Sequence, residues 1–246
     1  IQTLLRRGRE RKLMNIIDFH THILPRMDDG SHSVGESLEM LRAEAAAGIR
    51  TVAVTPHFYA DLDTPETFLK RRSEALEKLE EKMTDGLPDL LPGAEVAYFE
   101  GMKNCGLLSE MTICGTGLLL IEMPMGKWSE RMFSEILQLA ENLGITPLLA
   151  HIDRYGVTRD DIRLLKKFVI NGGLIQANAG AFLHFATAGK MIKMINDNLV
   201  HLLGSDCHNV STRPPNLGEA VEKITKKAGP APITIIEAAQ SRIITR

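Results

Sequence analysis

Leu118-Leu119-Leu120-Ile121-Glu122 is an apolar run that ends in a carboxylate, and the same form recurs along the chain. A short apolar run between helix-like segments is typical of a strand buried on both faces of a parallel sheet. Seven such runs occur, at about 15–20, 51–57, 91–98, 117–123, 145–151, 173–178 and 200–206. Amphipathic segments with helix start signals separate them. The pattern therefore predicts an α/β fold in which helices cover parallel strands.

Parallel strands covered by helices either close into a barrel or form an open, doubly wound sheet. No Gly-x-Gly-x-x-Gly segment follows the first run, which disfavours the dinucleotide-binding form of the open sheet. No linker or composition break divides the chain, so residues 15–246 are predicted to form one domain. Residues 1–14 are basic, and we interpret them as an extension before a natural start at Met14 or as a short helix.

The composition excludes several classes of function. The net charge is −2 and only 5% of the 246 residues are aromatic, so the chain lacks the basic footprint and stacking residues typical of nucleic-acid binding. No apolar run reaches the roughly 20 residues that span a bilayer, so we expect no membrane insertion. The cysteines Cys105, Cys114 and Cys207 form no paired motif, which favours a reducing, cytoplasmic location.

Nine side chains of metal-ligand type lie in the predicted strands, at their ends, or in the loops that follow them. They are His20, His22, Asp29, His57, Glu95, Glu122, His151, Asp206 and His208. In a barrel of parallel strands the carboxyl ends meet at one rim. Imidazole binds Zn, Mn and Fe, and carboxylates bind hard divalent ions. Such a set therefore predicts a hydrolytic metal centre.

Each of these residues also has an ordinary explanation when taken alone. A buried histidine is commonly a hydrogen-bonded core residue, a carboxylate at a strand end can be solvated, and Asp29 in Asp28-Asp29-Gly30 can serve a turn. These explanations do not account for ligand-type groups at six of seven strand ends. A lone buried carboxylate is costly, and metal coordination offsets that cost.

Eight motifs closely resemble those of the polymerase-and-histidinol-phosphatase (PHP) superfamily. Within it they are most similar to the bacterial manganese-dependent protein-tyrosine phosphatases of capsule and exopolysaccharide synthesis. The motifs are Asp18-Phe19-His20-Thr21-His22, Asp28-Asp29-Gly30, Thr55-Pro56-His57, Gly93-Ala94-Glu95, Leu120-Ile121-Glu122, Ala150-His151-Ile152-Asp153-Arg154-Tyr155, Gly204-Ser205-Asp206-Cys207-His208-Asn209 and Arg213-Pro214-Pro215. They occur in the family's order, and the resemblance covers about residues 15–240.

The resemblance implies a distorted (β/α)7 TIM-like barrel, the PHP fold, that holds three divalent metal ions. Manganese is expected, with iron, zinc or magnesium as alternatives. By position, the first metal takes His20, His22, Glu95 and Asp206, the second takes Glu95, Glu122 and His151, and the third takes Asp29, His57 and His208. Arg154 and Arg213 match the family's phosphate-binding arginines and are the expected catalytic residues.

The implied function is a metal-dependent phosphotyrosine-protein phosphatase, in which the ions lower the pKa of a bridging water so that hydroxide attacks phosphorus. The expected substrate is a phosphotyrosine protein, such as a bacterial tyrosine kinase of capsule or exopolysaccharide synthesis. The alternative enzyme is a small-molecule phosphomonoesterase such as histidinol phosphatase. A catalytically silent binding barrel is a third hypothesis. The sequence leaves the oligomeric state and the general acid open.

One motif points to a different mechanism. Cys207 and Arg213 have the C-x5-R spacing of cysteine-dependent tyrosine phosphatases. Asp206 replaces the histidine expected before the cysteine, and the intervening residues include no glycine, which a tight amide cradle favours. We therefore interpret Cys207 as incidental. His201, in an apolar run, is interpreted as a core residue.

Overall fold

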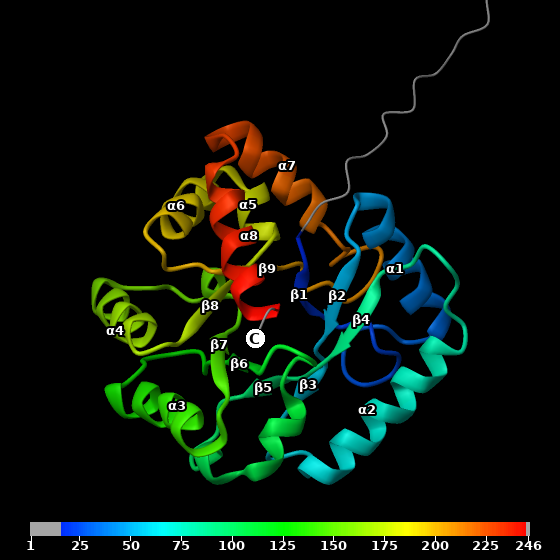
Figure 1. The fold of residues 1–246 in the computed structure, drawn as a ribbon, viewed down its shortest axis with the longest axis horizontal. Coiled ribbons are helices and arrows are strands. Elements are labelled where there is room, and N and C mark those ends of the chain that lie inside the picture. The colour runs from blue at the N-terminus through cyan, green and yellow to red at the C-terminus, as the bar shows by residue number, and fades with distance from the viewer. Residues whose placement is uncertain (1–15, 245–246) are drawn as a thin grey trace, which may run out of the picture.

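The computed structural model describes residues 16–244; residues 1–15 and 245–246, which include the predicted N-terminal extension or helix, lie outside the described part. Short strands alternate with helices along these residues (Figure 1). The strands are β1 Asp18–Thr21, β2 Thr51–Val54, β3 His57–Phe58, β4 Asp89–Pro92, β5 Glu95–Ala97, β6 Leu118–Glu122, β7 Thr146–Leu149, β8 Leu174–Asn178 and β9 Leu202–Gly204. The α/β class predicted from the sequence is confirmed.

All pairings between these named strands are parallel. One sheet has the order β1-β2-β4 and the other has the order β3-β5-β6-β7-β8-β9. Backbone hydrogen bonds join them where β2 and β4 lead into β3 and β5: Gly93 N donates to Val54 O and Glu95 N to Pro56 O, both at 3.0 Å. The strands form a curled parallel sheet with helices around it (Figure 1).

Two of the seven predicted strands are each divided, and their prediction as continuous strands was wrong. The run 51–57 breaks at Pro56, which has no N–H group to give to a ladder. The run 91–98 breaks at Gly93, where an added Cβ would lie 3.0 Å from the Ile113 side chain. His57 therefore begins β3 instead of ending the second strand, and it pairs in register with Glu95.

Helices lie between the strands, as the amphipathic segments predict. They are α1 Val34–Ala47, α2 Pro65–Glu80, α3 Glu130–Leu143, α4 Arg159–Ile170, α5 Gly180–Leu183, α6 Phe185–Asn196, α7 Leu217–Ala228 and α8 Ala231–Ile244, with short 3₁₀ turns at Met102–Asn104, Gly106–Met111 and Ile152–Arg154. Thr158 caps α4 through a capping box with Asp161. Gly48 ends α1 with a φ of 90°, a left-handed conformation that favours glycine.

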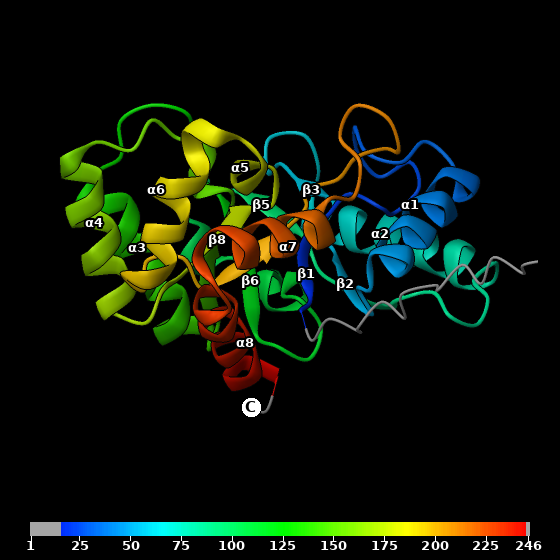
Figure 2. The same ribbon diagram turned by 90° about the horizontal axis from the view of Figure 1, so that it is seen from above.

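Both faces of the sheet are apolar. A small cluster that includes Phe19, Leu118 and Leu120 fills the inside of the curl, and a larger cluster lies between the sheet and the helices. Ile243 of α8 joins the inner cluster, so α8 covers the amino ends of the strands. In Figure 2, α8 lies at the lower side, and the loop after β9 lies at the upper side. The carboxyl ends of the strands are therefore free to form a site.

None of the helices within residues 16–244 combines the length and apolar character needed to cross a membrane.

Candidate metal centre

The nine predicted ligands lie together at the carboxyl ends of the strands. His20 is in β1, His57 begins β3, Glu95 begins β5 and Glu122 ends β6. The others follow β1, β7 and β9 within a few residues: His22, Asp29, His151, Asp206 and His208. Each lies within 4 Å of at least one other member of the set. Parallel topology thus gathers residues that are distant in the sequence.

Glu95 lies at the centre of the set and is buried. Its Oε2 is 3.0 Å from His20 Nε2, 3.3 Å from His22 Nε2 and 3.1 Å from His57 Nδ1. Its Oε1 is 2.8 Å from His151 Nε2. Burial raises the pKa of the Glu95 carboxyl, but the His20 charge and hydrogen bonds from His151 and His20 outweigh it and hold the pKa well below its ordinary value.

The first predicted ligand set lies together around His20 and His22. Their Nε2 atoms are 3.0 Å apart, as expected for residues two apart in an extended segment. Asp206 Oδ1 is 3.7 Å from His20 Nε2 and 3.5 Å from His22 Nε2. Burial raises the pKa of Asp206, but the His20 and His22 charges outweigh it, so the carboxyl stays ionised. An ionised carboxylate among imidazoles favours cation binding.

The third predicted set also lies together, and His22 joins it. Asp29, His57, His208 and His22 each offer an atom within 4.8 Å of the others. Asp29 Oδ1 is 3.3 Å from His208 Nε2 and 3.7 Å from His57 Nε2. Asp29 is the most exposed of the nine, since its side chain is 67% accessible. This group is therefore the edge of the centre that opens to solvent.

The second predicted set is looser. Glu122 Oε1 is 3.5 Å from His151 Nε2, which in turn contacts Glu95. The compact group around Glu122 contains Glu95 and His57 instead of His151. Burial and then the Glu95 charge raise the pKa of the Glu122 carboxyl. His57 thus lies close to both the second and the third predicted sets.

The donor atoms fit a divalent ion. His57 Nδ1 and His208 Nε2 are buried and make no hydrogen bond within the described residues, although carboxylate oxygens lie 3.1 and 3.3 Å away. Buried polar atoms rarely lack a partner unless another group satisfies them. Imidazole nitrogens and carboxylates that converge in this way, some of them without a hydrogen-bond partner, are the donor set of a metal site.

Two of the predicted ligands have a left-handed backbone. The φ angle is 31° at His151 and 55° at Asp206, which is uncommon for residues other than glycine. Such conformations cost about 1–3 kcal/mol each and persist where the surrounding structure holds them. They lie immediately after β7 and β9, where the chain turns to present each side chain at the rim.

Arg154 and Arg213 both contact Asp206. Arg154 Nη2 pairs with Asp206 Oδ2, and Arg213 Nη2 donates to Asp206 Oδ1 at 2.7 Å. The ion-pair partner of Arg154 is therefore the buried Asp206, whereas Asp160 on the surface pairs with Arg163. A cavity of about 310 Å³ beside Asp206 is lined by both arginines. Two guanidinium groups therefore face one open space next to the ligand cluster.

Sequence reasoning gave no role to three residues that orient the cluster. Asp28 Oδ2 lies 2.7 Å from His22 Nδ1 and accepts the N–H of His57 at 2.8 Å. A carboxylate behind a ligand histidine fixes its ring. Gln176 and Asn178 of β8 contact His151 and Asp206. Two polar residues on one face of an apolar strand were the available signal for them.

The structure also bears on the interpretations of Cys207 and His201 and on the aromatic residues near the site. Cys207 is fully buried, and burial raises the pKa of its thiol well above the usual value, so a nucleophilic thiolate is disfavoured. His201 Nδ1 accepts the Ile175 N–H, which confirms the core interpretation. Among the loop aromatics, Phe58 is buried, Trp128 packs on Tyr155 with ring centroids 4.9 Å apart, and Tyr59 stacks on His57 at 5.1 Å.

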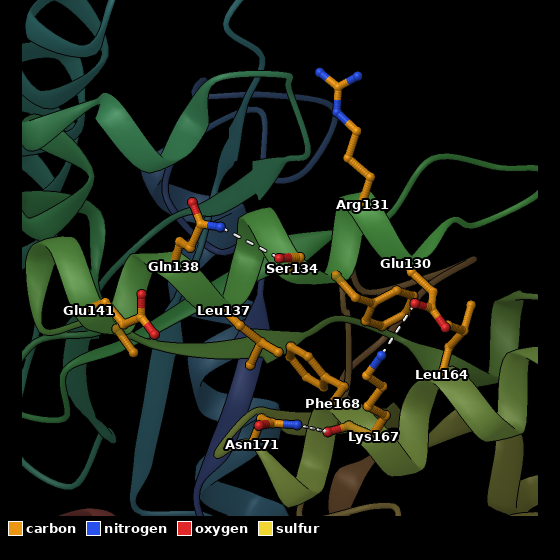
Figure 3. Close-up of a pocket in the computed structure, with 12 residues that line it drawn as sticks. Glu130, Arg131, Ser134, Leu137, Gln138, Glu141, Leu164, Lys167, Phe168 and Asn171 are labelled. Carbon is orange, nitrogen blue, oxygen red and sulfur yellow. Dashed lines mark hydrogen bonds and ion pairs between the residues drawn. The ribbon is translucent and has the colours of Figure 1, made fainter.

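A separate cavity of about 560 Å³ lies between α3 and α4 (Figure 3). Its edge carries the ion pair of Lys167 with Glu130. Leu137 and Phe168 form its apolar floor. Its lining includes no cluster of histidines and carboxylates, so the chemistry belongs to the centre at the strand ends.

Comparison with known proteins agrees with this geometry. Tyrosine-protein phosphatase YwqE of Bacillus subtilis is 33% identical over 225 residues, which cover 87% of this chain and 85% of that protein. Tyrosine-protein phosphatase CpsB of Streptococcus agalactiae is 32% identical over 227 residues, which cover 87% and 91%.

A solved structure also matches, with a TM-score of 0.78, 28% identity and 94% coverage of both chains. It comes from the crystal structures of "YwqE from Bacillus subtilis and CpsB from Streptococcus pneumoniae, unique metal-dependent tyrosine phosphatases". A family model described as capsular polysaccharide synthesis, CpsB/CapC, matches residues 16–244. The chain therefore belongs to the CpsB/CapC family of capsular polysaccharide synthesis.

Proposed function

We propose that this protein is a metal-dependent tyrosine-protein phosphatase. The observation that carries the proposal is the meeting of nine histidines and carboxylates at one end of the sheet, beside two arginines that share Asp206. Relatives that cover most of this chain are named tyrosine-protein phosphatases, and a structural relative is described as metal-dependent. The family description places the reaction in capsular polysaccharide synthesis.

Three divalent ions, with manganese the first choice, would be held by the nine ligands. When bound, such ions supply an activated water and offset the negative charge of phosphate. The chain itself orients the donors, since Asp28 holds the ring of His22 and the N–H of His57. We further infer that the curled sheet is a distorted (β/α)7 barrel, because His22 N donates to Cys207 O at 2.9 Å and links β1 to the segment after β9.

Arg154 and Arg213 would bind the phosphoryl oxygens. Their side chains are 33% and 35% exposed at the cavity beside Asp206, so an incoming phosphate reaches them. Forked N–H donors match the geometry of phosphate and stabilise its charge as it shifts. The tyrosyl leaving group has a pKa of about 10, so it departs with less protonation than an alkyl alcohol needs. No side chain is assigned as general acid.

Apolar side chains on the rim loops favour a protein substrate over a small phosphate ester. Leu62 precedes α2, Met125 precedes α3 and Phe185 begins α6, and these three are 79%, 76% and 93% exposed. The loops that carry them follow β3, β6 and β8, so they lie at the end of the sheet that holds the ligands. Exposed apolar groups around a site are typical of a surface that binds a protein. The expected partner is a phosphotyrosine-bearing kinase in the cytoplasm.

The first test is hydrolysis of a phosphotyrosine peptide by chelator-stripped protein, with and without Mn²⁺. Activity that returns only with metal supports the proposal, and Cys207→Ala should retain it within about twofold because the thiol is fully buried. Full activity without metal, lost in Cys207→Ala, would overturn it. Faster turnover of histidinol phosphate than of the peptide would favour the small-molecule alternative.

A second test concerns the rim. Phe185→Ser should raise the KM for a phosphotyrosine protein severalfold and leave turnover of p-nitrophenyl phosphate unchanged. Ile170→Ser is the matched control, since Ile170 is 84% exposed but ends α4, at the amino ends of the strands. Equal effects of the two substitutions, or no effect of Phe185→Ser, would remove the rim from substrate binding.

A further inference from the structure

β8 lies between β7 and β9 and contributes none of the nine predicted ligands. It nevertheless carries two buried amide side chains, Gln176 and Asn178. Residues two apart on a strand point to the same face, so both amides lie on one side of β8. Buried amides in a strand that is otherwise apolar call for specific hydrogen-bond partners.

The two amides join neighbouring ligand loops through one hydrogen-bonded chain. His151 N donates to Gln176 Oε1 at 2.5 Å, Gln176 Nε2 donates to Asn178 Oδ1 at 3.0 Å, and Asn178 Nδ2 donates to Asp206 Oδ2 at 2.7 Å. Asp153 Oδ1 accepts the backbone N–H of Asn178 at 2.7 Å and fixes its position from the other side.

The donor-to-acceptor direction of this series of hydrogen bonds is determined by its two ends. The backbone N–H of His151 can only donate, so the Gln176 oxygen must face it. The Gln176 amino group then faces Asn178, whose oxygen must accept. The Asn178 amino group is left to face Asp206, and an ionised carboxylate can only accept. Glutamine and asparagine satisfy every link, whereas an acid or an apolar residue at either position breaks it.

The hydrogen-bonded chain ends at His151 and Asp206, the two predicted ligands whose backbone is left-handed. At Asp206 it occupies Oδ2, while Oδ1 faces His20 and His22 at 3.7 and 3.5 Å. Gly204 leaves the room that the arrangement needs, because an added Cβ there would lie 2.8 Å from Gln176 Nε2 and 2.5 Å from His20 Cβ. Backbone, glycine and amides together decide which oxygen of Asp206 is presented to the cluster.

We propose that Gln176 and Asn178 are positioning residues that hold His151 and Asp206 in ligand geometry, so that β8 serves the metal centre without contributing a ligand. This inference rests on the proposed metal dependence, but not on the identity of the phosphorylated substrate.

The test measures the affinity of chelator-stripped protein for Mn²⁺ by calorimetric titration, in the wild type and in the variants Asn178→Asp and Gln176→Met. Both replacements are close in size to the original side chain. Asn178→Asp removes the hydrogen bond to Asp206, and Gln176→Met removes the two hydrogen bonds of the Gln176 amide, to His151 and to Asn178. The apparent Kd for Mn²⁺ should rise about 10- to 100-fold, as loss of such supporting contacts does at other metal sites. Saturating Mn²⁺ should restore kcat partly and leave the KM for phosphotyrosine peptide nearly unchanged.

Gln240→Met is the matched control. Gln240 is also buried, and its Oε1 also accepts a backbone N–H, that of Ile17 at 3.2 Å, but it belongs to α8 at the far end of the sheet. It should lower the melting temperature of the metal-free protein about as much as Gln176→Met and leave Mn²⁺ affinity unchanged.

Wild-type Mn²⁺ affinity in both β8 variants would overturn the proposal, and so would an equal loss of affinity in Gln240→Met. Absence of Mn²⁺ binding by the wild-type protein would overturn it together with the proposed function. Weakened Mn²⁺ binding in the variants of a protein that hydrolyses no phosphotyrosine would support the positioning role and reject the phosphatase.

Discussion

Glu95 and Glu44 are both buried glutamates near β1, yet the groups around them shift their pKa values in opposite directions. Glu95 is surrounded by imidazoles, and its pKa lies well below the ordinary value. Glu44 of α1 faces the buried carboxyl of Asp18, and burial, followed by the Asp18 charge, raises its pKa well above that value. Burial opposes ionisation at both positions, so the neighbouring groups decide the protonation state.

The surroundings of Glu95 favour an ionised carboxylate that attracts cations, whereas those of Glu44 favour a protonated carboxyl group. Around Glu95 the neighbouring side chains are histidines, and His57 Nδ1 faces it at 3.1 Å without a hydrogen bond. At Asp18 and Glu44 burial raises the pKa of both carboxyl groups, so this pair favours protonation over two negative charges. A buried acid alone is therefore weak evidence for a metal site, and its nearest partners are strong evidence.

The largest effect is expected from Glu95→Gln. The amide keeps the size of the side chain but removes the charge that sits between four histidines. We expect kcat/KM for phosphotyrosine peptide to fall by at least about 10³-fold, because a metal centre contributes several kcal/mol to the transition state. Bound Mn²⁺, measured by elemental analysis, should fall in parallel.

Glu44→Gln makes the same chemical change in the other region and is the control for Glu95→Gln. It should retain both Mn²⁺ content and turnover. If the two substitutions reduced metal content equally, the distinction between the two buried acids would not hold.

A smaller effect is expected from Arg154→Ala. Arg154 pairs with Asp206 at the edge of the imidazole cluster, where the proposed phosphate binds, whereas no arginine among residues 16–244 forms an ion pair with Glu44. Loss of one preorganised donor should lower kcat about 10²-fold while Mn²⁺ content stays at the wild-type level.

Arg163→Ala is the matched control, because Arg163 is 78% exposed and pairs with Asp160 on the outer surface of α4. Its turnover should match wild type. Loss of Mn²⁺ from Arg154→Ala would show that Arg154 supports the ligand Asp206 and would argue against a direct role on phosphate.

The gathering of the nine ligand-type side chains could be predicted because the predicted strands are largely apolar, so that histidines and carboxylates near their ends are conspicuous. The breaks at Pro56 and Gly93 were not predicted, since a segment of seven or eight residues has much the same pattern whether the strand is continuous or divided. Pro56 was a usable signal, because proline rarely lies within a central strand. The division matters for the site, since it brings His57 and Glu95 into register.

The supporting residues were harder to predict than the ligands. Asp28 precedes Asp29 directly, and sequence alone does not tell which of two adjacent carboxylates binds metal and which orients a histidine. Gln176 and Asn178 are amides, which a search for ligand types passes over. Their function depends on partners after β7 and after β9 that only the folded chain brings near. Glu44 likewise gives no sequence signal, since its partner is 26 residues away.

The smallest effect is the stability change expected from Glu44→Gln in metal-free protein. A carboxyl whose folded pKa is raised stabilises the fold fully below its unfolded pKa, and that contribution is lost as pH rises towards the folded pKa. Replacing Glu44 by a neutral amide removes this loss. The variant should therefore melt close to wild type near pH 4 and progressively higher than wild type towards neutral pH.

Each kcal/mol gained in this way should raise the melting temperature by about 2–4 °C for a chain of this length. Thermal melts of the two proteins at several pH values, all with chelator, measure the difference. Glu95→Gln in the same series should lower the melting temperature at neutral pH, because the histidines around it lose their anion. Opposite signs for one substitution at two buried glutamates would show that the carboxyl pair is tolerated at a cost in stability, whereas the central carboxylate holds its cluster together even without metal.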